Sequence, residues 1–301
     1  MRRVWLLAAV LVVGACSGGD DEGTAPIEPR RTTSTITTTT TTVDLQSRPP
    51  APASASEAAT MITSAEDVIH DVTLDDDDPR VAHAAHVEQV ATRAIAEHPD
   101  WDERVLADVP AAYRQAVIDN VAASRELRAL VANPRPNLPA WRIVEPAPAE
   151  ELRLYYEEGE AEYGVPWQYL AAVHLIETKT GRVRGASTAG ALGPMQFLPA
   201  TWAKYGRGDI ESNHDSILTA ARYLAANGAP RDMHNALFRY NPTERYVRAV
   251  TLYAERMRTD PMAYRGYWGW QVYYWSTLGD VWLRTGWSLD EPRPVQPSDL
   301  Q

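Results

Sequence analysis

Between residues 56 and 132, apolar side chains recur every three or four positions, with polar residues between them. That spacing places the apolar residues on one face of an α-helix, whereas a strand would alternate. We therefore predict four amphipathic helices that pack as a small bundle, the short third one beginning at a capping box of Asp100 and Glu103. The segments expected to separate the helices are Asp75 to Asp78 with Pro79, then Pro99, Pro110 and Asn133-Pro134.

Prolines interrupt the helical pattern between residues 133 and 148, where we expect an extended connector that marks a domain boundary. The helical period then resumes. One helix is predicted over residues 149–163, and a second should begin at Pro166 and end at Gly181. Residues 149–260 are predicted to form a helical domain, so the fold class is all-α.

Glu177 lies on the apolar face of the second of these helices. Its spacing from Leu170, Val173 and His174 is that of a single helical face, so the carboxyl group should point inward. Burial and the negative end of the helix dipole both disfavour the charged form of a carboxyl group. A glutamate kept protonated in this way suits a general acid, although most helical glutamates are simply solvated.

The chain begins with the pattern of a targeting segment. Arg2 and Arg3 precede an apolar run, residues 4–13, that is too short to span a bilayer, so residues 1–15 are predicted to be a signal peptide. The Val-Gly-Ala that precedes Cys16 resembles the lipobox of bacterial lipoproteins. Because Cys16 is the only cysteine, lipid attachment explains it better than structural use or an incidental thiol.

Residues 16–55 contain a threonine run and several prolines with few large apolar residues. Such a composition cannot bury enough surface to offset chain entropy, so we expect a disordered spacer. The spacer would give the folded part reach from the membrane, or serve as an inert stalk. The expected location is extracytoplasmic, with a lipid anchor in the cell membrane.

The formal net charge is −11, and lysine occurs only at Lys179 and Lys204. So acidic a chain argues against nucleic-acid binding, which depends on neutralising phosphates, but it is compatible with neutral sugars. The aspartates at 75–78 lack the spacing of a calcium loop, and His83 with His86 lacks further ligands. We interpret them as a solvated turn and surface histidines, and predict no metal and no cofactor.

A glycine-rich loop follows Glu177 and spans residues 185–202. Its glycines would allow the backbone to approach a ligand closely, while Ser187 and Gln196 offer groups that can hydrogen-bond hydroxyl and amide substituents. On its own, this loop indicates sugar binding only weakly, because glycine-rich loops are common.

Together with two neighbouring strings, however, the loop resembles in order and spacing the three motifs of the lytic transglycosylase family, whose catalytic domain is helical and lysozyme-like. The strings are Glu177-Thr178, Ser187-x-x-Gly190-Ala-x-Gly193-Pro-Met195-Gln196-Phe197 and Ala236-Leu237-x-x-Tyr240-Asn241. The resemblance covers about residues 150–260. It departs at Thr178, where the family usually has Ser, and at Arg239, where Ala is common; Arg239 would face solvent or meet a substrate carboxylate.

The resemblance implies that Glu177 protonates the glycosidic oxygen between N-acetylmuramic acid and N-acetylglucosamine in peptidoglycan. The resulting carboxylate would then accept the proton of the C6 hydroxyl of the same muramic acid, giving a 1,6-anhydro end without water. This chemistry needs one carboxylate, whereas ordinary glycosidases use two. The nearest other acids, Asp209, Glu211 and Asp215, are interpreted as loop and capping residues.

The resemblance also implies a set of substrate-binding residues, namely Ser187, Met195, Gln196, Tyr240 and Asn241. Tyr240 would hold the catalytic glutamate in position, although by its helical spacing it could be a core aromatic. We expect a monomer whose partners are peptidoglycan strands and, through its lipid, the membrane. Two alternatives stay open: a muramidase that hydrolyses the same bond, and a non-catalytic glycan-binding lipoprotein.

Residues 261–301 form an aromatic-rich C-terminal segment, in which nine tyrosines and tryptophans crowd positions 264–287. Aromatic rings stack on sugars and also fill protein cores. The segment could therefore supply glycan subsites or form a packed lid, and sequence alone leaves both open.

Overall fold

A computed structural model describes residues 47–300 of the chain. Helices make up most of this part and its strands are few and short, which confirms the predicted all-α class in its coarse form. The predicted signal peptide, Cys16 and most of the predicted spacer lie outside the described residues. The described end of the spacer is bound to the folded part, since the Arg48 guanidinium donates to the carbonyl oxygen of Leu300 at 3.2 Å.

The first four helices follow the predicted hydrophobic pattern. They are α1 (Ala55–Ile69), α2 (Pro79–Glu97), α3 (Asp102–Asp108) and α4 (Arg114–Arg128). Asp78 caps α2 by accepting a hydrogen bond from the Arg80 backbone NH. The predicted capping box of Asp100 and Glu103 is wrong, because Asp100 lies inside a 3-10 turn and no side chain caps α3.

The second half contains seven helices among the described residues. They are α5 (Ala149–Tyr163), α6 (Trp167–Thr178), α7 (Pro199–Tyr205), α8 (Asn213–Ala226), α9 (Met233–Tyr240), α10 (Glu244–Thr259) and α11 (Met262–Gly269). Helix α5 spans the predicted residues. Helix α6 ends before the predicted Gly181, because Lys179 and Thr180 already adopt left-handed backbone conformations with φ of 53° and 57°.

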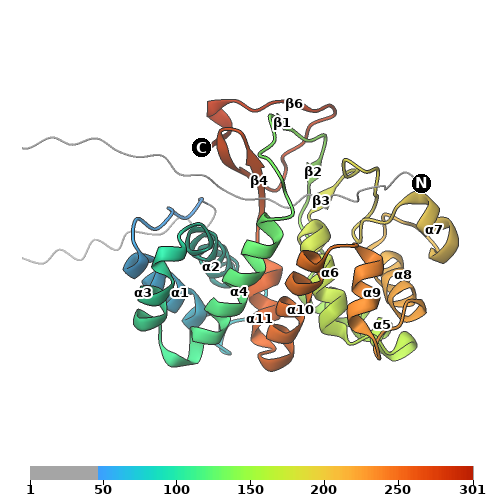
Figure 1. The fold of residues 1–301 in the computed structure, drawn as a ribbon, viewed down its shortest axis with the longest axis horizontal. Helices are drawn as coiled ribbons and strands as arrows, with labels where there is room; N and C mark the ends of the chain where they lie inside the picture. Colours follow the sequence, from blue (N-terminus) through green and yellow to red (C-terminus); the bar gives the residue numbers. More distant parts are fainter. Residues whose placement is uncertain (1–46, 301) are drawn as a thin grey trace, which may run out of the picture.

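Three antiparallel pairs of strands form a small β cap, seen above the helices in Figure 1. Strand β1 (Asn137–Leu138) pairs with β6 (Arg293–Pro294), β2 (Arg142–Ile143) with β3 (Val183–Arg184), and β4 (Val272–Ser276) with β5 (Gly279–Leu283). The predicted proline-rich connector is therefore part of the fold, since it supplies β1 and β2. Its Leu138, Trp141 and Ile143 join the hydrophobic core of the cap.

Helices α10 and α11 lie between the first bundle and the remaining helices (Figure 1). Helix α10 contacts both α4 and α6, and α11 contacts α2. Glu126 on α4 strengthens the first of these contacts by accepting hydrogen bonds from Arg245 at 3.0 Å and Arg248 at 2.7 Å. The bundle therefore packs directly against the helices that carry the motifs.

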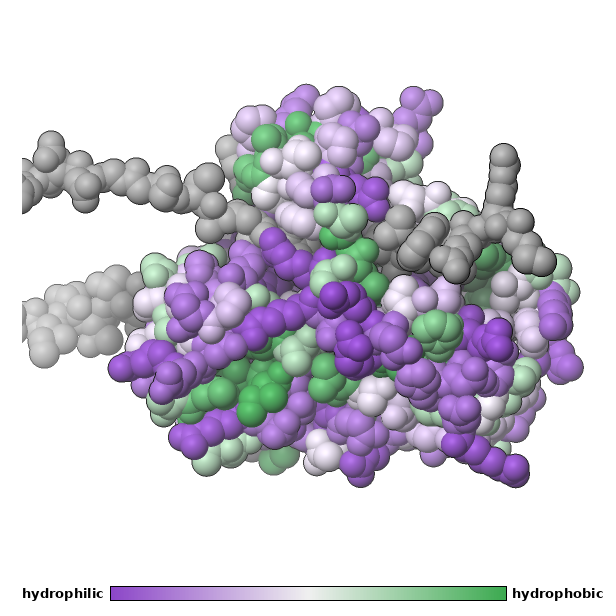
Figure 2. Space-filling model, viewed as in Figure 1, coloured by the Kyte–Doolittle hydropathy of each residue, from purple (hydrophilic) through white to green (hydrophobic). Residues whose placement is uncertain are grey.

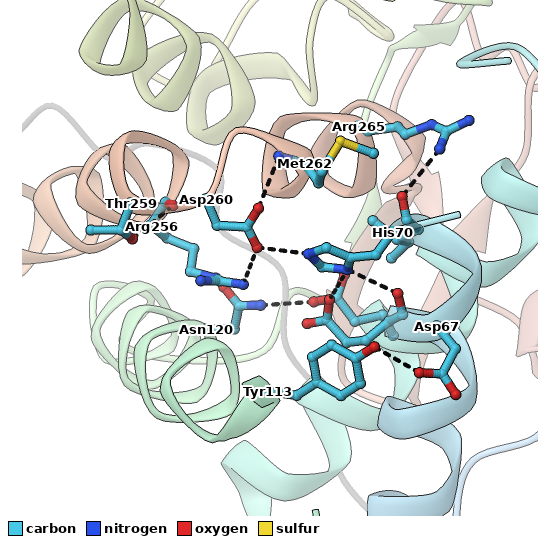
Figure 3. Close-up of polar contacts among 12 residues, drawn as sticks. Asp67, His70, Tyr113, Asn120, Arg256, Thr259, Asp260, Met262 and Arg265 are labelled. Carbon is cyan, nitrogen blue, oxygen red and sulfur yellow. Dashed lines mark hydrogen bonds and ion pairs between the residues drawn. The ribbon is translucent and has the colours of Figure 1, made fainter. Parts of the chain in front are cut away.

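A polar network joins the end of α1 to the junction of α10 and α11 (Figure 3). The Asp260 carboxylate lies 2.8 Å from His70 Nε2 and accepts hydrogen bonds from Arg256 at 2.6 Å and from the Met262 backbone NH at 3.0 Å. Hydrogen bonds to Asp260 and Glu66 raise the pKa of His70 to about 10. His70 is thus positively charged at neutral pH.

Several aromatic residues of the C-terminal segment fill the core. Tyr264, Tyr267, Trp270 and Tyr273 are all at most 6% exposed, which excludes them as stacking platforms for a glycan in this structure. The Tyr273 hydroxyl lies 2.6 Å from His86 Nε2. His86 is therefore a buried residue and not the predicted surface histidine, and its desolvation lowers its pKa to about 3.

Hydrophilic residues cover most of the face shown in Figure 2, and hydrophobic residues form separate smaller patches. None of the helices within residues 47–300 is both long and apolar enough to cross a membrane.

Candidate functional site

Glu177 occupies the last turn of α6, where α10 packs against it. The Tyr246 hydroxyl on α10 donates a hydrogen bond to Glu177 Oε1 at 2.7 Å. Burial raises the pKa of the half-buried Glu177 carboxyl to about 7, against the opposing effects of the Tyr246 hydrogen bond and the nearby Lys179. The group is therefore poised to give up and take back a proton near neutral pH.

The hydroxyl of Thr178 ties the end of α6 to the glycine-rich loop. It donates to the carbonyl oxygen of Pro194 at 2.6 Å and accepts from the Gly181 backbone NH at 3.1 Å. A β-carbon added to Gly193, whose φ is +73°, would lie only 1.9 Å from the Ile210 carbonyl oxygen. The hydrogen bond from Thr178 to Pro194 and the close approach of Gly193 to Ile210 hold the loop beside Glu177.

The three predicted binding residues of this loop differ in how accessible their side chains are to a ligand. Ser187 Oγ accepts hydrogen bonds from the backbone NH groups of Ala189 at 3.3 Å and Ala191 at 3.1 Å, so it shapes the loop. Gln196 adopts a left-handed backbone with φ of 51° and stays half-buried. The Met195 side chain is fully buried in the core, which corrects the prediction that it would touch substrate.

Tyr240 does not hold Glu177 in the predicted way. Its hydroxyl donates to the Met195 carbonyl oxygen at 2.5 Å, while the hydrogen bond to the glutamate comes from Tyr246. The Tyr240 and Tyr246 rings are parallel, with centroids 6.3 Å apart. Tyr240 therefore lies beside Tyr246, the tyrosine that hydrogen-bonds Glu177. Asn241, next to it, is 5% exposed, and its Oδ1 has no hydrogen-bond partner among residues 47–300.

Glu177 also borders a cavity of about 50 Å³ between the first bundle, α6 and the β cap. Glu177 is the only carboxylate among its lining residues, and the predicted binding residues do not line it. Its polar wall consists of Gln89, Thr92, Arg93, Ser124, Thr178 and Lys179, and its apolar wall of Leu127, Trp141, Ile176, Val183, Tyr253, Trp270 and Val272. Sequence reasoning missed this wall, because much of it comes from helices and strands far from the motifs.

The acids set aside on sequence grounds have local roles. Asp215 Oδ2 accepts from the Asp209 backbone NH at 2.8 Å, and Asp209 accepts from the Glu211 backbone NH at 3.0 Å. Ser212, and not Asp215, caps α8. Arg239 is exposed to solvent.

Within residues 47–300, no group of three His, Cys, Asp or Glu side chains is placed to hold a metal ion. No protein-family model, curated protein or solved structure matches the chain.

Proposed function

We propose that the protein is a peptidoglycan lytic transglycosylase that uses Glu177 as its single acid and base. The observation that carries the proposal is a half-buried glutamate whose pKa is raised to about 7 by burial, with no second carboxylate among the lining of its cavity. Glycosidases that activate water or form a covalent adduct need two carboxylates close together. A lone acid suits a reaction in which the substrate supplies its own nucleophile.

In the proposed reaction, the protonated Glu177 carboxyl donates its proton to the glycosidic oxygen as the bond between muramic acid and N-acetylglucosamine breaks. The resulting carboxylate keeps the hydrogen bond from Tyr246 and lies near the positive charge of Lys179. It then removes the proton of the C6 hydroxyl, whose oxygen closes onto C1. The glutamate ends protonated and ready for another cycle.

The surroundings support this assignment. Thr178 and Gly193 fix the loop beside Glu177, and Ser187 and Gln196 remain partly exposed on that loop, where a sugar could reach them. We propose a lysozyme-like catalytic domain over residues 149–260, acting as a monomer on peptidoglycan strands. A lipid on Cys16 would hold it at the outer side of the cell membrane.

The test compares the wild-type protein with Glu177→Gln and Glu211→Gln on purified peptidoglycan, with soluble products analysed by mass spectrometry. Glu177→Gln should lower product release by about 10³-fold, since general acid–base catalysis typically contributes about 10²–10⁴-fold. Glu211 is exposed and should be replaceable. Full activity of Glu177→Gln, or loss only in Glu211→Gln, would overturn the assignment, and inactivity of the wild type would favour a binding protein.

A further inference from the structure

Lys179 is the one cation on the cavity wall that forms no ion pair within 4 Å in residues 47–300, although Glu177 lies near enough for each to affect the pKa of the other. It lies two positions after Glu177 and is half-buried, and its ammonium group donates a hydrogen bond to the Leu175 carbonyl oxygen of its own helix at 3.1 Å. Arg93, on the same wall, is bound differently, because it forms an ion pair with Asp280 and stacks over the Tyr273 ring. The cavity thus contains a positive charge with capacity to bind an anion.

Thr92 adds a second, independent sign of a binding site. Its side chain lines the cavity and is only 1% exposed, and its hydroxyl has no hydrogen-bond partner within the described part of the chain. An unsatisfied buried hydroxyl costs about 1–3 kcal/mol, so such groups normally have a partner. Ser124, on the facing helix α4, contributes another hydroxyl to the wall.

We propose that this cavity is an anion subsite that receives a carboxylate carried by the muramic acid residue, with the Lys179 ammonium as its counter-ion and the Thr92 hydroxyl as a hydrogen-bond donor. The inference rests on the proposed function and specifies the substrate further. Two carboxylates have the right chemistry: the lactyl carboxylate of a muramic acid without peptide, and a carboxylate of the attached peptide. The attraction within a buried ion pair offsets its desolvation cost when hydrogen bonds also satisfy the charged groups, and the Thr92 hydroxyl would supply one.

The subsite would also influence the acid. Lys179 lowers the pKa of Glu177, and burial lowers the pKa of Lys179 itself to about 8. A bound carboxylate would keep the lysine charged and would offset its effect on the glutamate. The substrate would thereby help Glu177 to retain its proton until the glycosidic bond breaks.

The experiment measures binding in a Glu177→Gln background, where cleavage cannot interfere. Calorimetry would compare a muramic-acid disaccharide, the same disaccharide as its lactyl methyl ester, and a disaccharide carrying a stem peptide. Lys179→Met should weaken the binding of a carboxylate probe by about 10-fold or more, as expected for the loss of a hydrogen bond to a charged group, and should leave the methyl ester unchanged. Thr92→Val should produce a smaller loss of the same selectivity.

The chain provides a matched control, because Lys204 is its only other lysine and is exposed on α7. Lys204→Met should leave all three affinities unchanged, and Lys179→Arg should restore much of the lost binding by restoring the charge. A loss confined to the peptide-free acid identifies the lactyl carboxylate, and a loss confined to the peptide-bearing probe identifies a peptide carboxylate. Equal weakening of all three probes by Lys179→Met, or no weakening of any of them, would refute the subsite.

The two proposals fail separately. If the wild-type protein shows the predicted carboxylate selectivity but never cleaves peptidoglycan, the subsite stands and the catalytic proposal falls. If it cleaves peptidoglycan but Lys179→Met alters every probe equally, the catalytic proposal stands and the subsite falls.

Discussion

Two buried regions of the molecule hold a glutamate whose pKa burial has raised, one around Glu88 in the first bundle and one around Glu177 at the end of α6. Glu88 is 3% exposed and accepts hydrogen bonds from Asn120 at 2.8 Å and from Trp270 at 3.1 Å. The cavity beside it measures only about 10 Å³. Glu88 is therefore a satisfied core residue with no room for a ligand beside it.

The pKa of Glu177 is raised like that of Glu88, but Glu177 has a larger cavity beside it that a ligand can enter. Glu177 accepts a hydrogen bond from Tyr246, is half-buried, and borders a larger cavity that is also lined by Lys179, a lysine without an ion pair in the described part of the chain. Of the two acids, Glu177 combines the raised pKa with room for a ligand, which is the arrangement expected of a functional acid. For Glu88 the neighbouring Glu66 adds to the effect of burial, so the same shift has a purely structural cause.

The largest expected effect separates these two acids directly. Glu177→Gln should abolish catalysis while leaving the circular dichroism spectrum and melting temperature close to wild type. Glu88→Gln should retain activity within about threefold, because the amide has the same shape and general acid–base catalysis is not lost. A cell-wall digestion assay run beside thermal melts of both variants makes the comparison.

The opposite pattern would show that the functional acid had been chosen wrongly. Equal loss of activity in both variants, with both proteins folded, would mean that burial and not access determines which glutamate matters.

A smaller effect is expected for Tyr246→Phe. Removing the hydroxyl deletes a hydrogen bond that favours the charged carboxylate, so the pKa of Glu177 should rise above about 7. A general acid is active when protonated, so kcat/KM should fall as the pH rises through the Glu177 pKa, and this fall should move to higher pH in the variant. The maximal rate should drop by about tenfold, because the anion formed during the reaction loses a charged-group hydrogen bond.

Tyr240→Phe is the matched control, since its hydroxyl binds the Met195 carbonyl and not the glutamate. It should leave the descending limb of the pH profile in place. A shift caused by Tyr240→Phe and absent in Tyr246→Phe would restore the assignment made from sequence.

The assignment of the tyrosines shows where sequence reasoning succeeded and stopped. Helical spacing predicted an inward Glu177 and the span of α5, because both depend on local periodicity. The role of Tyr246 depends on how α10 packs against α6, which no local pattern specifies. Thr92 lies far from the motifs in sequence, and β1 pairs with β6 across most of the folded chain, so neither was predictable.

The C-terminal end of α6 shows a second limit of prediction from sequence. Gly181 was the expected stop of α6, yet Lys179 adopts the left-handed conformation at the end of the helix. A left-handed lysine costs free energy that glycine would avoid, so propensity predicted the later end. Two hydrogen bonds of the Thr178 hydroxyl help to fix the observed end, a local one from the Gly181 backbone NH and one to Pro194 in the glycine-rich loop.

The smallest expected effect concerns stability in the region of Glu88. Glu66 lies near both Glu88 and His70, and His70 joins α1 to Asp260 with a pKa raised from 6.5 to about 10. The raised value means that the charged His70 stabilises the fold fully below pH 6.5 and that this contribution is lost as the pH rises through about 10. His70→Asn should therefore lower the melting temperature by a few degrees at pH 6, at about 2–4 °C per kcal/mol for a protein of this size.

Melting curves of wild type and His70→Asn between pH 6 and pH 10 measure this contribution. The difference should shrink toward pH 10, while peptidoglycan cleavage by the variant at 25 °C should stay near wild type. A melting-temperature difference that grew with pH would contradict the charged His70–Asp260 contact.

The central claim is that Glu177 serves an intramolecular reaction without water, and digestion of peptidoglycan in water enriched in oxygen-18 tests it most directly. Mass spectrometry should find muramic acid products with 1,6-anhydro ends and no incorporated oxygen-18. Reducing ends that carry the mass of one oxygen-18 atom would instead show hydrolysis, and would contradict the account.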